Sequence, residues 1–297
     1  MIVGLLLCVV VGVLWASSGT IYSRVAKSGD STLAFLACAT GFSFFFSWLG
    51  VRDWHGVSVD ATSRLPELVA LMVVGGAFTG FYQQLMITAM VRGHNAVAWT
   101  IAQSAMAIPF LAGLAIWHDS PPASKIVGVC CLLATVAILG AAKTSRSELA
   151  TASTWLPLVL TMFVANGVGQ TLTTVPSRWP NWTDTHHLRV ALSFTGVFAV
   201  NGLVAAFTKQ RVTRATVLLG LLSSAFVFTA QMIIFPCMDI LQRYGIVGIC
   251  YPLACGSTII SFSLYSLLVL KERFQARETV AITLGLAGLG LMIIAGR

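Results

Sequence analysis

Ten stretches that contain no Asp, Glu, Lys or Arg divide this chain, and they constrain its fold more than any other feature. Each is long enough to cross the roughly 30 Å hydrocarbon core of a bilayer at about 1.5 Å per helical residue. They cover residues 1–22, 31–51, 68–91, 96–117, 126–142, 155–175, 190–207, 215–238, 245–270 and 280–296. The pattern predicts an all-α polytopic membrane protein with ten transmembrane helices. Pro109 and Pro252 lie inside two of the stretches and predict kinks there, because proline removes a helical hydrogen bond.

The composition agrees with a bilayer as the solvent. Apolar residues make up 57% of the chain and charged residues only 9%, against roughly 25% charged residues in soluble domains. The net charge is +8, but the eighteen Lys and Arg residues are scattered over short connections. We therefore expect membrane lipids as partners and no nucleic acid, since a basic patch would need a cluster of these residues.

The sequence lacks the usual signatures of catalysis. All seven cysteines fall inside apolar stretches, without CxxC or Cys/His spacings, which is typical of small packing residues. It has no HExxH motif and no P-loop lysine motif. We expect no catalytic residues, no metal, no cofactor and no enzymatic activity.

The two halves of the chain show a weak internal repeat. At an offset of 150, residues 16–20 fall on residues 166–170; at 148, residues 75–78 with Gln83 fall on residues 223–226 with Gln231; and at 153, Asp119 meets Glu272. The expected units are residues 1–147 and 148–297. Because each unit holds an odd number of predicted spans, the two must enter the membrane in opposite orientations, as in many transporters.

At these positions the sequence resembles the drug/metabolite transporter superfamily, in its ten-span branch with EamA-like repeats. There each repeat begins with a Trp-small motif, seen here in 14–18 (LWASS), and ends with an acidic residue before a glycine-rich fifth helix. The second repeat shows this ending in 270–273 (LKER) and 283–290 (TLGLAGLG), whereas 117–122 (WHDSPP) departs from it. The resemblance implies a central cavity lined by the first, third and fourth helices of each repeat, with the fifth helices at the periphery.

Uncharged polar and aromatic side chains on those helices are the candidate substrate-binding residues. They are Trp15, Tyr82, Gln83, Trp99, Gln103, Asn166, Gln170, Gln231 and Tyr251. Buried amides need partners on neighbouring helices or on a ligand, and aromatic rings can enclose a cation. Our specific hypothesis is that Gln83 and Gln231, brought to equivalent depths by the repeat, face each other and bind the solute near the midplane.

These observations predict a secondary transporter that moves a small polar metabolite by alternating access. Because the stretches carry no charge, the solute is expected to be neutral, zwitterionic or a quaternary amine rather than strongly charged. The alternatives are an intramembrane enzyme and a non-transporting or lipid-moving membrane scaffold. Polar residues of both halves that converge on one chamber would distinguish the transporter from the scaffold.

Location, orientation and assembly are less constrained. We expect a multi-pass integral protein of the plasma (inner) membrane, as a monomer or homodimer. Eleven of the eighteen Lys and Arg residues lie in the odd-numbered loops, and the positive-inside rule then favours external termini. The family resemblance implies cytoplasmic termini instead, and we follow it.

Overall fold

The protein is described by a computed structural model, which defines residues 1–28, 31–51, 64–92, 95–142, 152–179, 185–209, 211–268 and 276–294. Nearly all of these residues are helical, and this part of the chain contains no strand. The α-helices are α1 (Ile2–Ser28), α2 (Thr32–Leu49), α4 (Leu65–Arg92), α5 (Asn95–Ser104), α6 (Ala107–Ala115), α7 (Ala123–Ala142), α8 (Ala152–Thr174), α9 (His186–Thr208), α10 (Arg214–Gln242), α11 (Cys250–Leu268) and α12 (Ala276–Ile294). The 3₁₀ turns η3 (Val175–Arg178) and η4 (Val247–Ile249) follow α8 and precede α11. The predicted all-α fold is confirmed for these residues.

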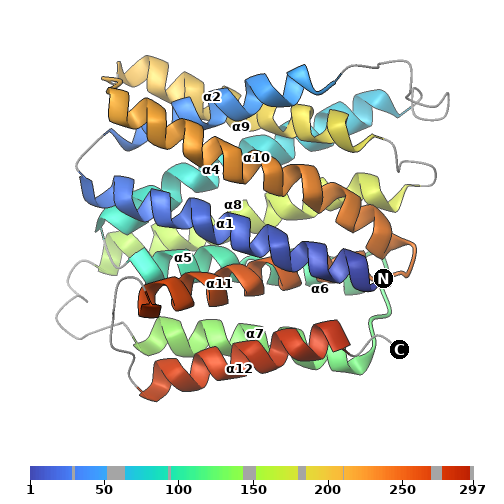
Figure 1. The fold of residues 1–297 in the computed structure, drawn as a ribbon. Coiled ribbons are helices and arrows are strands. Elements are labelled where there is room, and N and C mark those ends of the chain that lie inside the picture. Colours follow the sequence, from blue (N-terminus) through green and yellow to red (C-terminus); the bar gives the residue numbers. More distant parts are fainter. Residues whose placement is uncertain are drawn as a thin grey trace.

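The helices lie side by side in one bundle (Figure 1). α4 packs along α8 and α9, and α10 packs along α1 and α2. α2 also contacts α9, and α1 contacts α11. α7 and α12 pair with each other at one edge of the bundle, and the two ends of the chain lie at the same end of the bundle (Figure 1).

Seven of the described helices are long and apolar enough to cross a membrane. They cover Ile2–Ser28, Thr32–Leu49, Leu65–Val91, Pro157–Arg178, His186–Thr208, Arg214–Gln242 and Val247–Tyr265. Three shorter apolar helices cover Ile101–Ala115, Ala123–Thr135 and Thr279–Ile293. Large apolar side chains such as Leu6, Leu160 and Leu203 are more than half exposed on the outside of the bundle, where lipid rather than water is the suitable solvent. These features indicate an integral membrane protein.

Glycines allow the closest helix contacts. Cβ atoms added at Gly76 of α4 and Gly196 of α9 would overlap the backbone of the opposite helix, at Ser193 and Val73. In the α7–α12 pair, a Cβ at Gly128 would lie 2.7 Å from the carbonyl oxygen of Gly288. Lipid gives no hydrophobic drive for helix association, so such close contact is what holds these helices together.

Two of the predicted spans are interrupted. The stretch 96–117 forms α5 and α6 with a turn at Ala105 and Met106 between them, rather than one kinked helix. Pro109 is the third residue of α6, in the first turn, where its missing N–H costs nothing. The stretch 245–270 starts with Gly245 at φ +66°, followed by η4, and only then by α11.

Candidate functional site

One cavity lies among six helices in the middle of the bundle. Its lining side chains come from α1, α4, α5, α8, α10 and α11: Trp15, Ser18, Tyr22, Thr79, Tyr82, Gln83, Trp99, Gln103, Asn166, Gln170, Val227, Gln231 and Tyr251. The cavity has a volume of about 70 Å³, which is small against the roughly 300–1,000 Å³ of most ligand pockets. In this conformation the cavity therefore accommodates a small solute only.

All nine side chains proposed from the sequence line this single cavity. The structure adds Ser18, Tyr22, Thr79 and Val227, which the sequence analysis did not select. None of the lining residues is Asp, Glu, Lys or Arg. The cavity is thus polar but uncharged, and the binding role of its residues stays a prediction.

The break between α5 and α6 changes the hydrogen bonds of a backbone carbonyl beside the cavity, that of Ala102, which accepts from the Ala105 N–H at 3.4 Å. In a continuous helix the N–H of Met106 would donate to the carbonyl of Ala102, but here it donates to the carbonyl of Gln103 at 3.2 Å. The Asn166 Nδ2 atom also donates to the Ala102 oxygen, with a shorter bond of 2.7 Å. A side chain of α8 therefore supplies a hydrogen bond to the carbonyl at the helix break, as non-helical backbone at membrane depth requires.

The orientation of the Asn166 amide determines that of the Gln170 amide, one turn later on α8. Gln170 Nε2 donates to Asn166 Oδ1 at 3.3 Å and also lies 3.8 Å from the Cys255 thiol. The Gln170 Oε1 atom is buried and accepts no hydrogen bond from the residues that the structure describes.

Tyr251 forms the adjacent part of the cavity wall. Its hydroxyl is 2.7 Å from the Thr173 hydroxyl, and Thr173 also donates to the carbonyl of Gln170 at 3.0 Å. The Tyr251 ring stacks on Trp15, with ring centroids 6.2 Å apart and planes at 12°. α1, α8 and α11 are joined here by an aromatic pair and a short chain of hydrogen bonds.

Trp99 of α5 belongs to the first half of the chain, whereas Gln170 and Tyr251 belong to the second. Its side chain is tightly packed. Its ring sits directly over Gly19 of α1, where an added Cβ would be 2.7 Å from the indole. Tyr22 meets it edge-on and Phe262 stacks on it, with centroids 6.4 and 5.7 Å away. The indole Nε1 is buried and has no acceptor among the described protein groups.

Gln83 and Gln231, the pair singled out by the repeat, differ in their surroundings. Gln83 Oε1 accepts from Asn201 Nδ2 of α9 at 3.1 Å, and Gln84 Nε2 donates to Asn201 Oδ1 at 2.9 Å. Gln231 Oε1 is buried without a partner. Each unpaired buried group of this kind costs about 1–3 kcal/mol, unless water or a solute supplies the missing bond.

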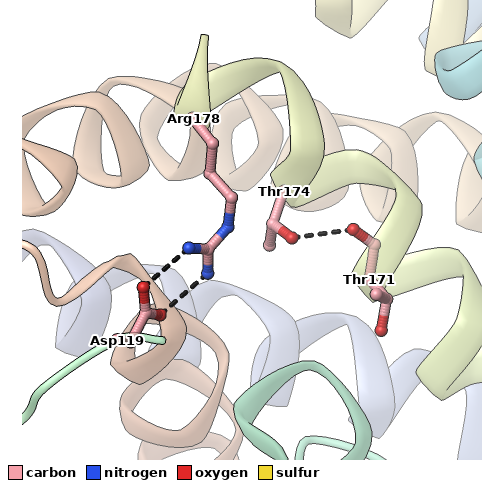
Figure 2. Close-up of polar contacts among 4 residues, drawn as sticks. All are labelled: Asp119, Thr171, Thr174 and Arg178. Carbon is pink, nitrogen blue, oxygen red and sulfur yellow. Dashed lines mark hydrogen bonds and ion pairs between the residues drawn. The ribbon is translucent and has the colours of Figure 1, made fainter. Parts of the chain in front are cut away.

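Charged side chains gather outside the cavity. Asp119, after α6, forms a bidentate ion pair with Arg178 of η3 at 2.7 and 2.8 Å (Figure 2). The Arg178 guanidinium also lies 4.2 Å from the centre of the Trp117 ring. A few residues away, Arg189 of α9 pairs with Asp239 of α10 and donates to Ser177 at 2.6 Å. Figure 2 also shows the end of α8, where Thr174 donates to the Thr171 carbonyl.

The pair of Arg189 and Asp239 was missed by the sequence analysis. Both residues directly flank charge-free stretches, 190–207 and 215–238, but α9 and α10 extend past these limits and bury them at 0% and 7% exposure. The sequence contains a hint of this ion pair, because an Arg and an Asp adjoin two apolar stretches whose helices can pack against each other. Charge at the edge of an apolar stretch does not have to be exposed.

The cysteines lie in the helices as small side chains. The Cys8 and Cys250 sulfur atoms are 3.5 Å apart between α1 and α11, and all seven thiols are free. Within the described ranges no three His, Cys, Asp or Glu side chains form a group that suits a metal ion.

Comparison with known proteins identifies the fold but no family. No protein-family model matches the chain, and no curated protein matches it. Solved structures do match, among them one described only as "Crystal structure of protein". It is 13% identical with a TM-score of 0.65, and the match covers 98% of this chain and 98% of that chain. At this identity the likeness shows a shared fold along nearly the full length of both chains.

Proposed function

We propose that the protein is a secondary transporter, which moves a small polar metabolite across the membrane by alternating access. The observation that carries this proposal is the convergence of polar side chains from both chain halves on one uncharged cavity. Three buried polar atoms there, on Trp99, Gln170 and Gln231, lack protein partners. Buried polar side chains with unpaired atoms, in the walls of a chamber lined mostly by aromatic and amide side chains, are typical of a binding site.

The packing of the helices supports two inverted repeats with ten spans in all. If α5 and α6 together count as the fourth span, then α4 and α10 are the third spans of the two repeats. α4 packs on α8 and α9, the first and second spans of the other repeat, and α10 packs on α1 and α2 in the same way. Such an exchange of partners is expected of a pseudo-twofold arrangement, whose two equivalent conformations provide access from either side.

A non-transporting or lipid-moving scaffold is the alternative. It would need polar faces turned outward to separate partners, whereas Gln83, Asn166 and Gln170 are 5%, 4% and 7% exposed and face a common interior. This difference favours the transporter. The resemblance to the drug/metabolite transporter superfamily, given above, points to the same class.

The test starts with purified protein, screened by thermal shift against amino acids, sugars, nucleosides and amines. A solute that raises the unfolding temperature is then offered to proteoliposomes. We expect Gln231→Ala to reduce uptake or affinity at least tenfold, because the solute loses a hydrogen-bonding partner. Stability should change little, since the Gln231 oxygen has no partner among the described residues. Gln83→Ala should reduce uptake or affinity in the same way but also destabilise the protein, because Asn201 loses its acceptor.

Thr283→Ala, on the exposed face of α12, is the matched control and should behave as the wild type. Unchanged uptake and affinity in both glutamine variants would refute the hypothesis that these two residues bind the solute. Failure of every solute class to bind and to accumulate would refute transport itself.

A further inference from the structure

The polarity of one cavity wall is fixed by the break between α5 and α6. A backbone carbonyl only accepts hydrogen bonds, so the Asn166 group that meets the Ala102 oxygen must be the amide NH₂. The Asn166 oxygen then faces Gln170, which must present its own NH₂ to it. This chain of bonds has only one consistent direction, and it leaves Gln170 Oε1 as a buried acceptor without a donor among the described residues, on a side chain that lines the cavity.

The direction of the hydrogen bond of the Tyr251 hydroxyl can be deduced in the same way. Thr173 has a single hydroxyl hydrogen, which it donates to the carbonyl of Gln170. Both bonds of Thr173 are satisfied only if Tyr251 donates its hydrogen to the Thr173 oxygen. The Tyr251 oxygen keeps its lone pairs but has no hydrogen left for a solute.

The result is a wall that accepts hydrogen bonds and donates none. It consists of Gln170 Oε1, Tyr251 Oη and the stacked rings of Trp15 and Tyr251, and we call it the acceptor wall. The lining residues include neither a cation that would repel a positive group nor an anion that would neutralise it. Uncharged oxygens and aromatic faces together can replace part of the hydration shell of a small cation.

We propose that the acceptor wall binds a primary ammonium group of the transported solute. This inference rests on the proposed function and narrows its substrate class. An ammonium has three N–H donors and no lone pair, so it complements two oxygens that lack donors. A quaternary amine would fill the space but leave Gln170 unpaired, and a carboxylate would face oxygen lone pairs. The solute is thus an amine or an amino-group-bearing zwitterion.

Methylammonium and tetramethylammonium are the probes for a direct test. Both are small monovalent cations, and they differ chiefly in N–H donors and in bulk. Their chloride salts are titrated into the purified protein at constant ionic strength, and apparent affinities are derived from unfolding temperatures. We expect methylammonium to bind at least tenfold more tightly, because a hydrogen bond from a charged donor to a buried acceptor is involved. Equal or tighter binding of tetramethylammonium would overturn the proposal, as would tighter binding of acetate.

Three variants separate the acceptor wall from general effects on folding. Gln170→Met keeps the length of the side chain and removes the acceptor, and we expect it to reduce the preference at least fivefold. Asn166→Leu should reduce the preference as well, since it frees Gln170 to turn. Tyr251→Phe removes the second oxygen while it keeps the ring on Trp15. Thr283→Ala is the control, and the unliganded unfolding temperature of each variant shows whether it is folded.

A preference that survives Gln170→Met and Tyr251→Phe would also overturn the proposal. Its failure is distinguishable from failure of the transporter itself. If proteoliposomes accumulate a solute without an amino group and neither cation competes with it, the ammonium site is wrong and transport stands. If no solute is accumulated, the transporter is wrong, and the affinities of the two cations still decide the ammonium site.

Discussion

Trp99 shows how a single small residue shapes the cavity. The indole lies over Gly19 and is flanked by Tyr22 and Phe262, so residues of α1 and α11 determine where this wall of the cavity lies. The absence of a side chain at Gly19 is what lets α5 approach α1 at this depth. The position of the ring, and with it the cavity, depends on this contact.

Gly19→Ala is therefore expected to displace Trp99. Its Cβ would lie 2.7 Å from the ring, and overpacking of this kind typically costs about 1–3 kcal/mol. We expect a lower unfolding temperature and a change in tryptophan fluorescence, with solute affinity reduced at least threefold. Gly50→Ala, where the added Cβ meets only ordinary contacts, is the control. A variant with unchanged fluorescence and affinity would show that Trp99 is not positioned by Gly19.

At the level of residues, the sequence predicted which side chains line the cavity but not how they are oriented. Polar side chains inside charge-free stretches are conspicuous, so Asn166, Gln170 and Gln231 were readily selected. The direction of the amide chain depends on the Ala102 carbonyl, which lacks the N–H of Met106 as a donor because of the helix break. Pro109 predicted a disturbance in that stretch, but the turn lies before the proline, at Ala105 and Met106.

At the level of helices, the contact between α4 and α9 depends on two glycines. A Cβ at Gly76 or Gly196 would overlap backbone atoms of the opposite helix, and backbone cannot move aside as a flexible side chain can. The two helices belong to different halves of the chain. Their contact therefore holds the halves together as well as the individual helices.

Gly76→Ala and Gly196→Ala should each destabilise the protein, by about 1–3 kcal/mol or more for overpacking in a close contact. The unfolding temperature in detergent is the measurement. Gly290→Ala is the matched control, because nothing lies within 4 Å of its added Cβ, and we expect it to be neutral or slightly stabilising. Wild-type stability of both interface variants would show that α4 and α9 do not pack through these glycines.

The ion pair of Asp119 and Arg178 makes a second connection between the halves. It joins the end of α6 to η3, and both side chains are at most 8% exposed. Asp119→Asn alone leaves a buried guanidinium without its counter-charge, which typically costs about 3–5 kcal/mol. The double variant Asp119→Asn/Arg178→Met should recover part of this loss. If the double variant were destabilised by the full sum of the losses of Asp119→Asn and Arg178→Met, this would contradict a direct pairing.

Most helices were predictable at this scale. Charged residues bound the apolar stretches clearly, and each stretch without charge predicts one membrane span. The exceptions include the interrupted stretches 96–117 and 245–270, and also α9 and α10, which extend beyond their stretches and bury Arg189 with Asp239. A charge next to an apolar stretch reads as exposed unless its partner is known. That partner lies fifty residues away in the chain and is revealed only by the packing of the two helices.

At the scale of the whole molecule, the number of spans separates two descriptions of the protein. Among the described residues, seven helices meet the length and hydropathy of a membrane span, while three further apolar helices are shorter. If only the seven cross, the two ends of the chain lie on opposite sides of the membrane. If ten cross, with α5 and α6 as one span, the ends lie on the same side. The bundle favours ten, because the start of α1 and the end of α12 lie at the same end of it (Figure 1).

The test compares labelling of four positions in intact cells and in everted vesicles: tags at the two termini, and single cysteines introduced by Ser120→Cys and Val212→Cys. Ser120 and Val212 are exposed, between α6 and α7 and between α9 and α10 respectively. Ten spans place Ser120 and the C-terminus on the side of the N-terminus, whereas seven place both on the other side. Val212 lies opposite the N-terminus in either case and so serves as the internal control. We expect the ten-span pattern with cytoplasmic termini; labelling of Ser120 and the C-terminus together with Val212 would refute it, and with it the inverted repeat on which alternating access depends.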